Sequence, residues 1–271
     1  MAAREKTQIA KLGRASKGGL ISVAAAAAAL DLSGRATSVR LSRLARSGWA
    51  QRVRRGLYLI LPLEAEPDKS ATNDDPWVLA RELFSPCYIG GWSAAEHWGL
   101  TEQLFRSTLV VTAAPTRSKD VSFLGNTFRL FRVPPARLAD GVVKVWRGAE
   151  RVDVSSAERT LIDCLNAPEL GGGGRHVAQM LREYGESNKK DLKRLLAVAK
   201  TSATGAAWKR LGYLAEGLWP DDSTVPNAAK RHLSAGLARL DPTIAKRGRL
   251  LKRWRLWVNV EVDEFTQGST R

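Results

Sequence analysis

Signals for helix and strand boundaries follow one another closely between Gly18 and Leu61, and they constrain the fold more than any other part of the sequence. Ser22 and Ser33 are of the residue type that caps the N-termini of helices. Gly48 suits the left-handed backbone conformation that follows the end of a helix. The expected elements, in order, are helices over 5–16, 23–30 and 34–47 and β-strands over 49–53 and 57–61. This order predicts an N-terminal winged helix-turn-helix.

The rest of the chain mixes short β runs with amphipathic helices, which predicts a second, larger domain and an α+β (mixed) fold overall. We expect the winged helix-turn-helix to span residues 1–63 and the larger C-terminal α+β domain to span 76–271. The segment between them, 64–75, is acidic, polar and flanked by prolines, which is typical of a linker. The larger domain ends in a basic tail rich in arginine and tryptophan.

Four segments of the larger domain carry definite local signals. They predict a helix capped by Ser93, a flexible loop at 171–174, a basic helix near 228–240 and a closing strand over 254–262. On that strand, a period of two would bury Trp254, Leu256 and Val258 on one face. Arg253 and Arg255 would then point outward.

The charge of the chain is concentrated in two blocks. Of the 271 residues, 43 are lysine or arginine and 27 are aspartate or glutamate, so the net charge is +16. Residues 1–65 hold twelve of the cations against three acids, and residues 226–258 hold nine against one. A surplus of this size indicates a polyanionic partner, an anionic membrane surface or a basic tail. Because the segment 66–225 is nearly neutral, two surfaces with separate roles are favoured.

The helix expected over 34–47 has two contrasting faces. A helical wheel defines a buried face of Thr37, Ser38, Leu41, Leu44 and Ala45. The opposite face combines arginines with small residues, and no acidic residue occurs between Arg35 and Glu64. Such a face fits the major groove of DNA, where arginines reach guanine edges or phosphates. The candidate DNA-binding residues of this helix are Arg35, Ala36, Val39, Arg40, Ser42, Arg43 and Arg46.

The expected hairpin adds three more candidates, Arg52, Arg54 and Arg55, at the place where a wing meets the DNA backbone or the minor groove. A charged helix face by itself is typical of any solvated helix. The conjunction of capped helices, a glycine stop, a basic hairpin and few acids favours DNA binding.

The run GGLISVAAAAAALDLSGRATSVRLSRLARSGWAQRVRRGLYLI, residues 18–60, resembles the N-terminal winged domain of the AbiEi-family antitoxins of type IV toxin–antitoxin (abortive infection) systems. Its most distinctive part is RRGLY. Farther on, YIGGWSAAEHWGLTEQL, LVVTAAPTRS, LGNTFRLFRVPPARL and VDVSSAERTLIDCL are similar to later segments of that family. The resemblance covers roughly residues 15–170. The six-alanine helix and the long tail depart from the family pattern.

The resemblance implies a transcriptional autorepressor and antitoxin. The winged domain would bind inverted repeats in its own promoter, with Arg35 to Ser47 as recognition helix and Arg52 to Tyr58 as wing. The larger domain would counteract a nucleotidyltransferase-like toxin, and direct contact with that toxin is left open. Two alternatives stay open as well. One is a stand-alone regulator whose larger domain senses a ligand or a partner, and the other is a metal-dependent nuclease targeted to DNA.

The basic tail admits three interpretations: a core-facing strand, a second nucleic-acid surface, or a contact with the toxin or its anionic target. The candidate residues of this second basic surface are Arg247, Arg249, Lys252, Arg253 and Arg255.

No catalytic or metal-binding pattern is recognised, and we expect neither an enzyme nor a cofactor. His97, His176 and His232 follow no ligand spacing. The acidic residues Glu261, Asp263 and Glu264 are read as a solvated terminus rather than a nuclease site. The two cysteines make no disulfide framework, and the longest apolar run falls short of a membrane span. We therefore expect a cytoplasmic protein without a membrane partner.

Overall fold

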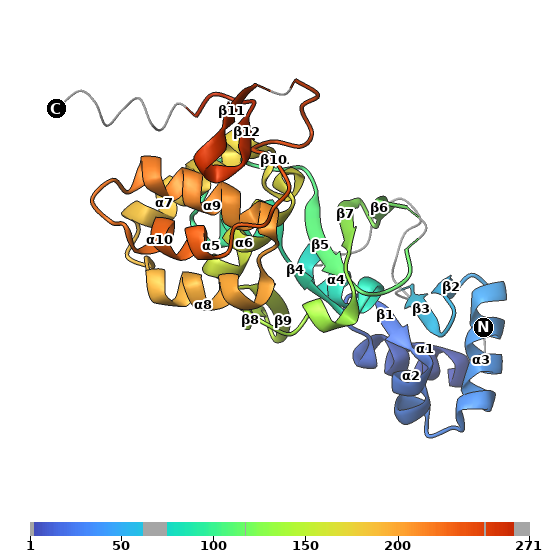
Figure 1. Cartoon of the computed structure of the whole chain (residues 1–271). Coiled ribbons are helices and arrows are strands. Elements are labelled where there is room, and N and C mark those ends of the chain that lie inside the picture. The colour runs from blue at the N-terminus through green and yellow to red at the C-terminus, as the bar shows by residue number, and fades with distance from the viewer. Residues whose placement is uncertain (1–2, 62–74, 117, 247, 263–271) are drawn as a thin grey trace. The chain divides into compact units, whose positions relative to one another are not determined.

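The computed structural model describes residues 3–61, 75–116, 118–246 and 248–262 (Figure 1). The chain forms two compact units. The first consists of Met1–Leu83, Ser122–Asn126 and Arg147–Glu150, and the second of the remaining residues. The expected linker lies almost wholly outside the described residues, so the domain boundaries and the linker stay predictions.

The first unit contains the elements expected for a winged helix-turn-helix. They are the helices α1 (Ala3–Ala15), α2 (Val23–Leu30) and α3 (Gly34–Arg46) and the strands β1 (Leu20–Ser22), β2 (Ala50–Arg54) and β3 (Leu57–Ile60). The strands form an antiparallel sheet in the order β1-β3-β2. Strand β1 was not expected from the sequence. It pairs with β3, the second strand of the hairpin, so that Leu20 lies opposite Leu59.

Three helices and the sheet enclose one small apolar core in this unit. Ile9 and Leu12 of α1, Ala26 of α2 and Leu41 and Leu44 of α3 are all buried in it. Ala26 is the only fully buried residue of α2, and its small side chain fits a helix packed closely between two others. The unit also includes most of helix α4 (Pro76–Phe84).

The second unit is built on a mixed six-stranded sheet in the order β6-β7-β5-β4-β9-β8. Its strands are β4 (Cys87–Ile89), β5 (Thr108–Thr112), β6 (Asp120–Phe123), β7 (Asn126–Arg132), β8 (Val142–Arg147) and β9 (Glu150–Ser155). The central strand β4 is antiparallel to β5 and parallel to β9, and β5 is parallel to β7. The α+β fold class expected from the sequence is therefore confirmed.

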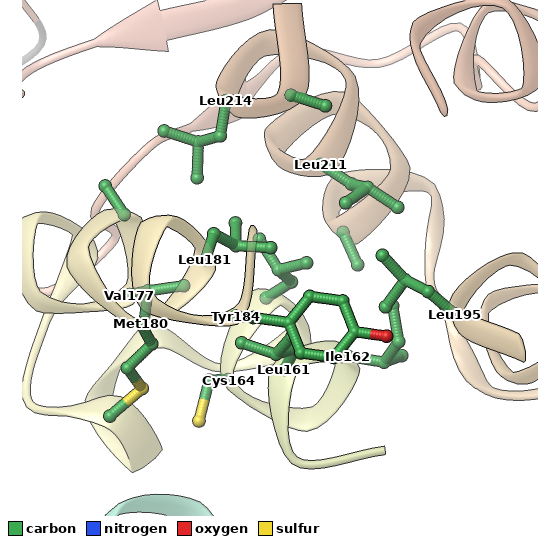
Figure 2. Close-up of a cluster of buried hydrophobic side chains, with 14 of the residues drawn as sticks. Leu161, Ile162, Cys164, Val177, Met180, Leu181, Tyr184, Leu195, Leu211 and Leu214 are labelled. Carbon is green, nitrogen blue, oxygen red and sulfur yellow. The ribbon is translucent and has the colours of Figure 1, made fainter. Parts of the chain in front are cut away.

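Six helices supply most of the buried core of the second unit. They are α5 (Gly91–Trp98), α6 (Ala157–Asn166), α7 (Gly174–Glu186), α8 (Leu192–Ser202), α9 (Gly205–Leu218) and α10 (Thr224–Arg231). Figure 2 shows side chains of α6, α7, α8 and α9 converging, among them Leu161, Leu181, Leu195 and Leu211. Tyr184 lies in the middle of this cluster and is fully buried.

Tyr88 of strand β4 ties the sheet to helix α6 by a hydrogen bond to a buried ion pair within that helix. The Arg159 guanidinium Nε donates to Asp163 Oδ1 at 2.9 Å, and the Tyr88 hydroxyl donates to Asp163 Oδ2 at 2.7 Å. Burial raises the pKa of Tyr88, so its hydroxyl stays protonated and available as a donor. Arg159 also donates to the carbonyl oxygens of Arg137 and Asp140. A buried charge is tolerated here because each side of the pair has hydrogen-bond partners.

The C-terminal segment differs from the single strand that the sequence predicted. It forms β11 (Arg249–Leu251), a 3-10 turn (Lys252–Trp254) and β12 (Leu256–Val258), joined with β10 (Ala238–Arg239) in a small sheet. Trp254 and Leu256 are fully buried as expected, and Val258 is half-buried. The backbone turns at Arg255, where φ is +51°. The strand is interrupted by a contact with a distant segment of the chain, because the turn places the Trp254 ring against Gly212 of helix α9.

Three further expectations for the larger domain are wrong in detail. Ser93 lies inside α5 rather than at its N-cap, and its hydroxyl accepts from the Leu109 amide at 2.9 Å. The glycines at 171–174 are not a flexible loop, because Gly174 begins α7 and its amide donates to Asp241 at 2.7 Å. The basic helix near 228–240 is instead α10, which ends at Arg231. Within the described residues, no helix is both long and apolar enough to cross a membrane.

The contact between Gly212 and Trp254 generates a test of the fold. A Cβ atom at Gly212 would overlap the Trp254 ring, whereas one at Gly236 would meet open space. Alanine normally favours a helix over glycine by about 1 kcal/mol, but overpacking a core costs about 1–3 kcal/mol. Gly212→Ala is therefore expected to lower the urea midpoint of the full chain, and Gly236→Ala to leave it nearly unchanged. A midpoint for Gly212→Ala at or above that of the natural chain would contradict this packing.

Candidate nucleic-acid interface

Local hydrogen bonds define both ends of helix α3. Ser33 is its N-cap, and the Ser33 hydroxyl accepts from the Ala36 amide at 3.3 Å. Ser47 is its C-cap, and Gly48 follows with a φ of +79°, in the left-handed region that favours glycine. The expectations for Ser33 and Gly48 are thus confirmed. The chain turns at Gly48 and enters the hairpin, so helix and wing belong to one continuous segment.

The two faces of α3 have opposite environments. Thr37, Leu41 and Leu44 are buried in the core of the first unit. On the opposite face, Val39 keeps 55% of its surface exposed. The other exposed candidates on this face are Arg35, Ala36, Arg43 and Arg46. The core side of the helix therefore leaves this set of predicted residues free in the solvent.

Two predicted residues lie at the edge of this face rather than on it. Ser42 is half-buried, and its hydroxyl lies 3.3 Å from the hydroxyl of Tyr58 in β3. Arg40 is half-buried as well, and its Nε is buried without a hydrogen-bond partner. An unpartnered buried N–H is unfavourable, so Arg40 would gain from a side-chain rearrangement that gave this Nε an acceptor.

A hollow of about 680 Å³ lies over the N-terminal half of α3. Its lining consists of Gln8, Leu32, Ser33, Arg35, Ala36, Val39, Arg40 and Arg43. Gln8 comes from α1 and was missed by the sequence analysis; the Gln8 Oε1 is buried and has no hydrogen-bond partner. One signal was available, because Gln8 lies one turn before the core residue Leu12 and so at the rim of the buried face.

The wing is the hairpin of β2 and β3, which turns at Arg55 and Gly56. Arg52, Arg54 and Arg55 are all exposed. The Arg54 guanidinium donates to the carbonyl oxygen of Glu82 in α4 at 3.2 Å, so one of its donors is already engaged. Arg52 and Arg55 have no such contact within the described residues.

The charge on this surface is uncompensated over the part of the chain that the structure describes. There, no carboxylate forms an ion pair with an arginine of α3 or of the wing, although ion pairs occur elsewhere in both units. The Arg46 Nε lies 3.5 Å from the carbonyl oxygen of Ser42 one turn earlier, at the limit of a hydrogen bond. The surface therefore offers donors and positive charge to an anion.

The second basic surface is dispersed, and part of it is structural. Arg253 pairs with Glu216 at 2.6 Å, and Arg255 donates to the carbonyl oxygen of Ser234 at 3.0 Å. Arg249 and Lys252 are exposed, and Arg247 lies outside the described residues. The outward direction expected for Arg253 and Arg255 agrees with their exposure.

The histidines and acidic residues do not gather into a site in the described part of the chain. The Thr101 hydroxyl and the Gly171 carbonyl oxygen lie within hydrogen-bond distance of the His176 ring, and His232 stacks on Trp208. No group of three or more potential metal ligands occurs among the described residues. Glu261 is exposed, and the other two residues of the acidic cluster lie beyond the described range.

Comparison with known proteins bears on the first unit and on the fold. Residues 14–60 match the family model described as transcriptional regulator, AbiEi antitoxin. This confirms the resemblance over the N-terminal segment, and α2, α3 and the hairpin lie within the matched residues. None of the curated proteins matches the chain.

Among solved structures, the chain is similar to the crystal structure of the RV2827C protein from Mycobacterium tuberculosis. The two share 18% sequence identity with a TM-score of 0.57, and the match covers 97% of this chain and 93% of that chain. At this identity the likeness shows the fold, over both units.

The cap at Ser33 generates a test of the interface. Replacing an N-cap serine by alanine costs about 1 kcal/mol, which corresponds to about a five-fold change in an opening equilibrium. Ser33→Ala is therefore expected to speed amide hydrogen exchange in the first turns of α3 by about that factor. Ser38→Ala is the matched control, since the Ser38 hydroxyl only bonds back to the Gly34 carbonyl oxygen and alanine favours the helix. Equal exchange rates in the two variants would show that the cap does not hold the helix.

Proposed function

We propose that this chain, whose residues 14–60 form an AbiEi antitoxin transcriptional-regulator domain, represses its own operon and is the antitoxin of a type IV toxin–antitoxin system. The first unit binds double-stranded DNA at inverted repeats upstream of the operon. The larger domain counteracts a nucleotidyltransferase-like toxin. Both actions take place in the cytoplasm.

The exposed face of α3 carries the DNA-binding part of this proposal. It holds Arg35, Arg43 and Arg46 without a carboxylate partner among the described residues, and its opposite face is committed to the core. A helix with this arrangement enters the major groove with its arginines directed at base edges and phosphates. Arg40 adds a fourth positive charge at the edge of this face.

The wing contributes phosphate contacts. Arg52 and Arg55 are exposed on the hairpin that follows α3 directly, so a helix in the groove brings them to the adjacent backbone. Arg54 is held by the Glu82 carbonyl oxygen and contributes mainly its charge.

The antitoxin part of the proposal is supported by the family of residues 14–60 and by the resemblance of segments up to about residue 170. A plain regulator that senses a ligand or a partner through the larger domain is the second candidate. This second candidate is supported by a hollow of about 650 Å³, lined by Arg175, Tyr213 and Arg249, in which a ligand could bind. The two candidates differ in one respect: the regulator represses a promoter but rescues no toxin.

Salt-dependent DNA binding is the first expected result. In gel shifts with the DNA upstream of the operon, the double substitution Arg40→Ala/Arg43→Ala is expected to weaken specific binding about 30-fold or more, at about 1–3 kcal/mol per contact. The slope of log K against log salt is expected to flatten by about 0.9 for each arginine that contacts a phosphate.

A matched control removes the same charge from elsewhere. Lys193 and Lys200 are exposed on α8, and Lys193→Ala/Lys200→Ala is expected to leave binding and its salt slope unchanged. If the control weakens binding as much as the α3 variant does, binding depends on net charge alone and the proposed interface is wrong.

Toxin rescue tests the other half of the proposal. Cutting the chain at Pro242 is unsuitable, because it removes Trp254 and Leu256 from the core. Arg249→Ala/Lys252→Ala changes only exposed side chains of the tail. When the chain is co-expressed with the toxin of the adjacent reading frame, this variant is expected to rescue growth less well and to bind DNA as before. Normal rescue with weakened DNA binding would place the tail on DNA, and no rescue by the natural chain would favour the plain regulator.

A further inference from the structure

The centre of the DNA-facing side of α3 is apolar. Val39 and Leu32 are 55% and 40% exposed, and they are the only large apolar side chains exposed among the described residues of the first unit. Both line the hollow over α3, together with the methyl group of Ala36. Exposed apolar side chains are common singly, but here they share one small surface.

Helix geometry places Val39 on the midline of this surface. Arg35 and Arg43 lie four residues before and after it, one turn away on either side, and Arg46 lies a further turn along. Leu41 and Thr37, two residues away in each direction, point to the core instead. When α3 lies in a groove, Val39 is therefore the side chain closest to the floor, flanked by guanidinium groups.

Helix stability does not account for a valine at this position. A β-branched residue at an exposed helix position is less favourable than alanine by several tenths of a kcal/mol. Val39 also has no place in the apolar core of either unit that would offset this, as far as the described residues show. The ring of arginines argues against a second copy of the chain as the partner, because like charges would face each other.

We propose that Val39 is a specificity-determining residue that recognises the C5-methyl group of a thymine in the major groove. This methyl is the one apolar group that a DNA base pair presents there, and small apolar side chains are its usual partners. Ala36 adds a second methyl contact, while Arg35 and Arg43 bind the guanine edges or phosphates on either side. The inference rests on the proposed DNA binding and adds the base that the helix reads at its centre.

The test removes the methyl group from each partner in turn. A preferred duplex is selected from a random pool with the full chain, and each thymine of its half-site is then replaced by deoxyuridine, which lacks only the C5-methyl. One such replacement is expected to weaken binding about three- to five-fold, the effect of burying about one methyl group. Val39→Ala is expected to weaken binding of the thymine duplex by a similar factor. The same deoxyuridine replacement should then weaken binding clearly less than it does in the natural chain, because only the Ala36 contact remains to be lost.

The choice of variant keeps the test clear of folding effects. Alanine favours a helix more than valine does, so a loss of affinity in Val39→Ala does not come from unfolding of α3. Lys193→Ala/Lys200→Ala serves again as control and should respond to deoxyuridine as the natural chain does.

The outcomes separate this inference from the proposed function. Specific binding that is lost with Arg40 and Arg43 but indifferent to every deoxyuridine overturns the role of Val39 and leaves the proposed function standing. The same holds if deoxyuridine weakens binding equally in the natural chain and in Val39→Ala, or if no thymine is selected at the centre of the half-site. An absence of sequence-specific binding overturns both.

Discussion

Burial of Leu41 and Leu44 determines which side of α3 meets the solvent. Both side chains are fully buried, together with Ile9 and Leu12 of α1. Rotating the helix by about 100° in one direction would place Arg40 and Arg43 where Leu41 and Leu44 lie, and burying these charges in an apolar core is unfavourable. The residues that α3 buries therefore determine which of its residues are exposed. Everything proposed for the exposed arginines follows from the packing of two leucines.

Arginine plays opposite roles in the two units. In the first unit the arginines of α3 lie at the surface without carboxylate partners among the described residues. In the second unit Arg159 and Arg210 are buried and hold segments together, Arg210 by donating to the carbonyl oxygens of Leu165 and Arg239. Burial lowers the pKa of Arg210 to about 10, which still leaves it charged near neutral pH. The net charge of the chain consequently overstates the charge that a polyanion meets.

Features that depend on residues close together in the sequence could be predicted from it, and features that depend on distant residues could not. Ser33, Leu41 and Gly48 act within one helix and its ends, so caps and periodicity predicted α3 almost to the residue. Ser93 carried the same kind of signal, but its hydroxyl binds an amide of strand β5 that folding brings close. Gly174 is capped by Asp241, which is 67 residues away. No local pattern contains such a partner. Likewise, Gln8 joins the candidate interface because folding brings it to the hollow that α3 residues line.

The position of Trp254 in the chain has a consequence for synthesis on the ribosome. The apolar core of the winged region draws on residues between Ile9 and Ile60, so it is complete soon after that segment emerges. The core of the larger domain waits for Trp254 and Leu256, which are translated nearly two hundred residues later. Domains generally fold as units in the order of translation. A nascent chain thus passes through a long interval in which the core of the first unit is complete and the core of the larger domain is not.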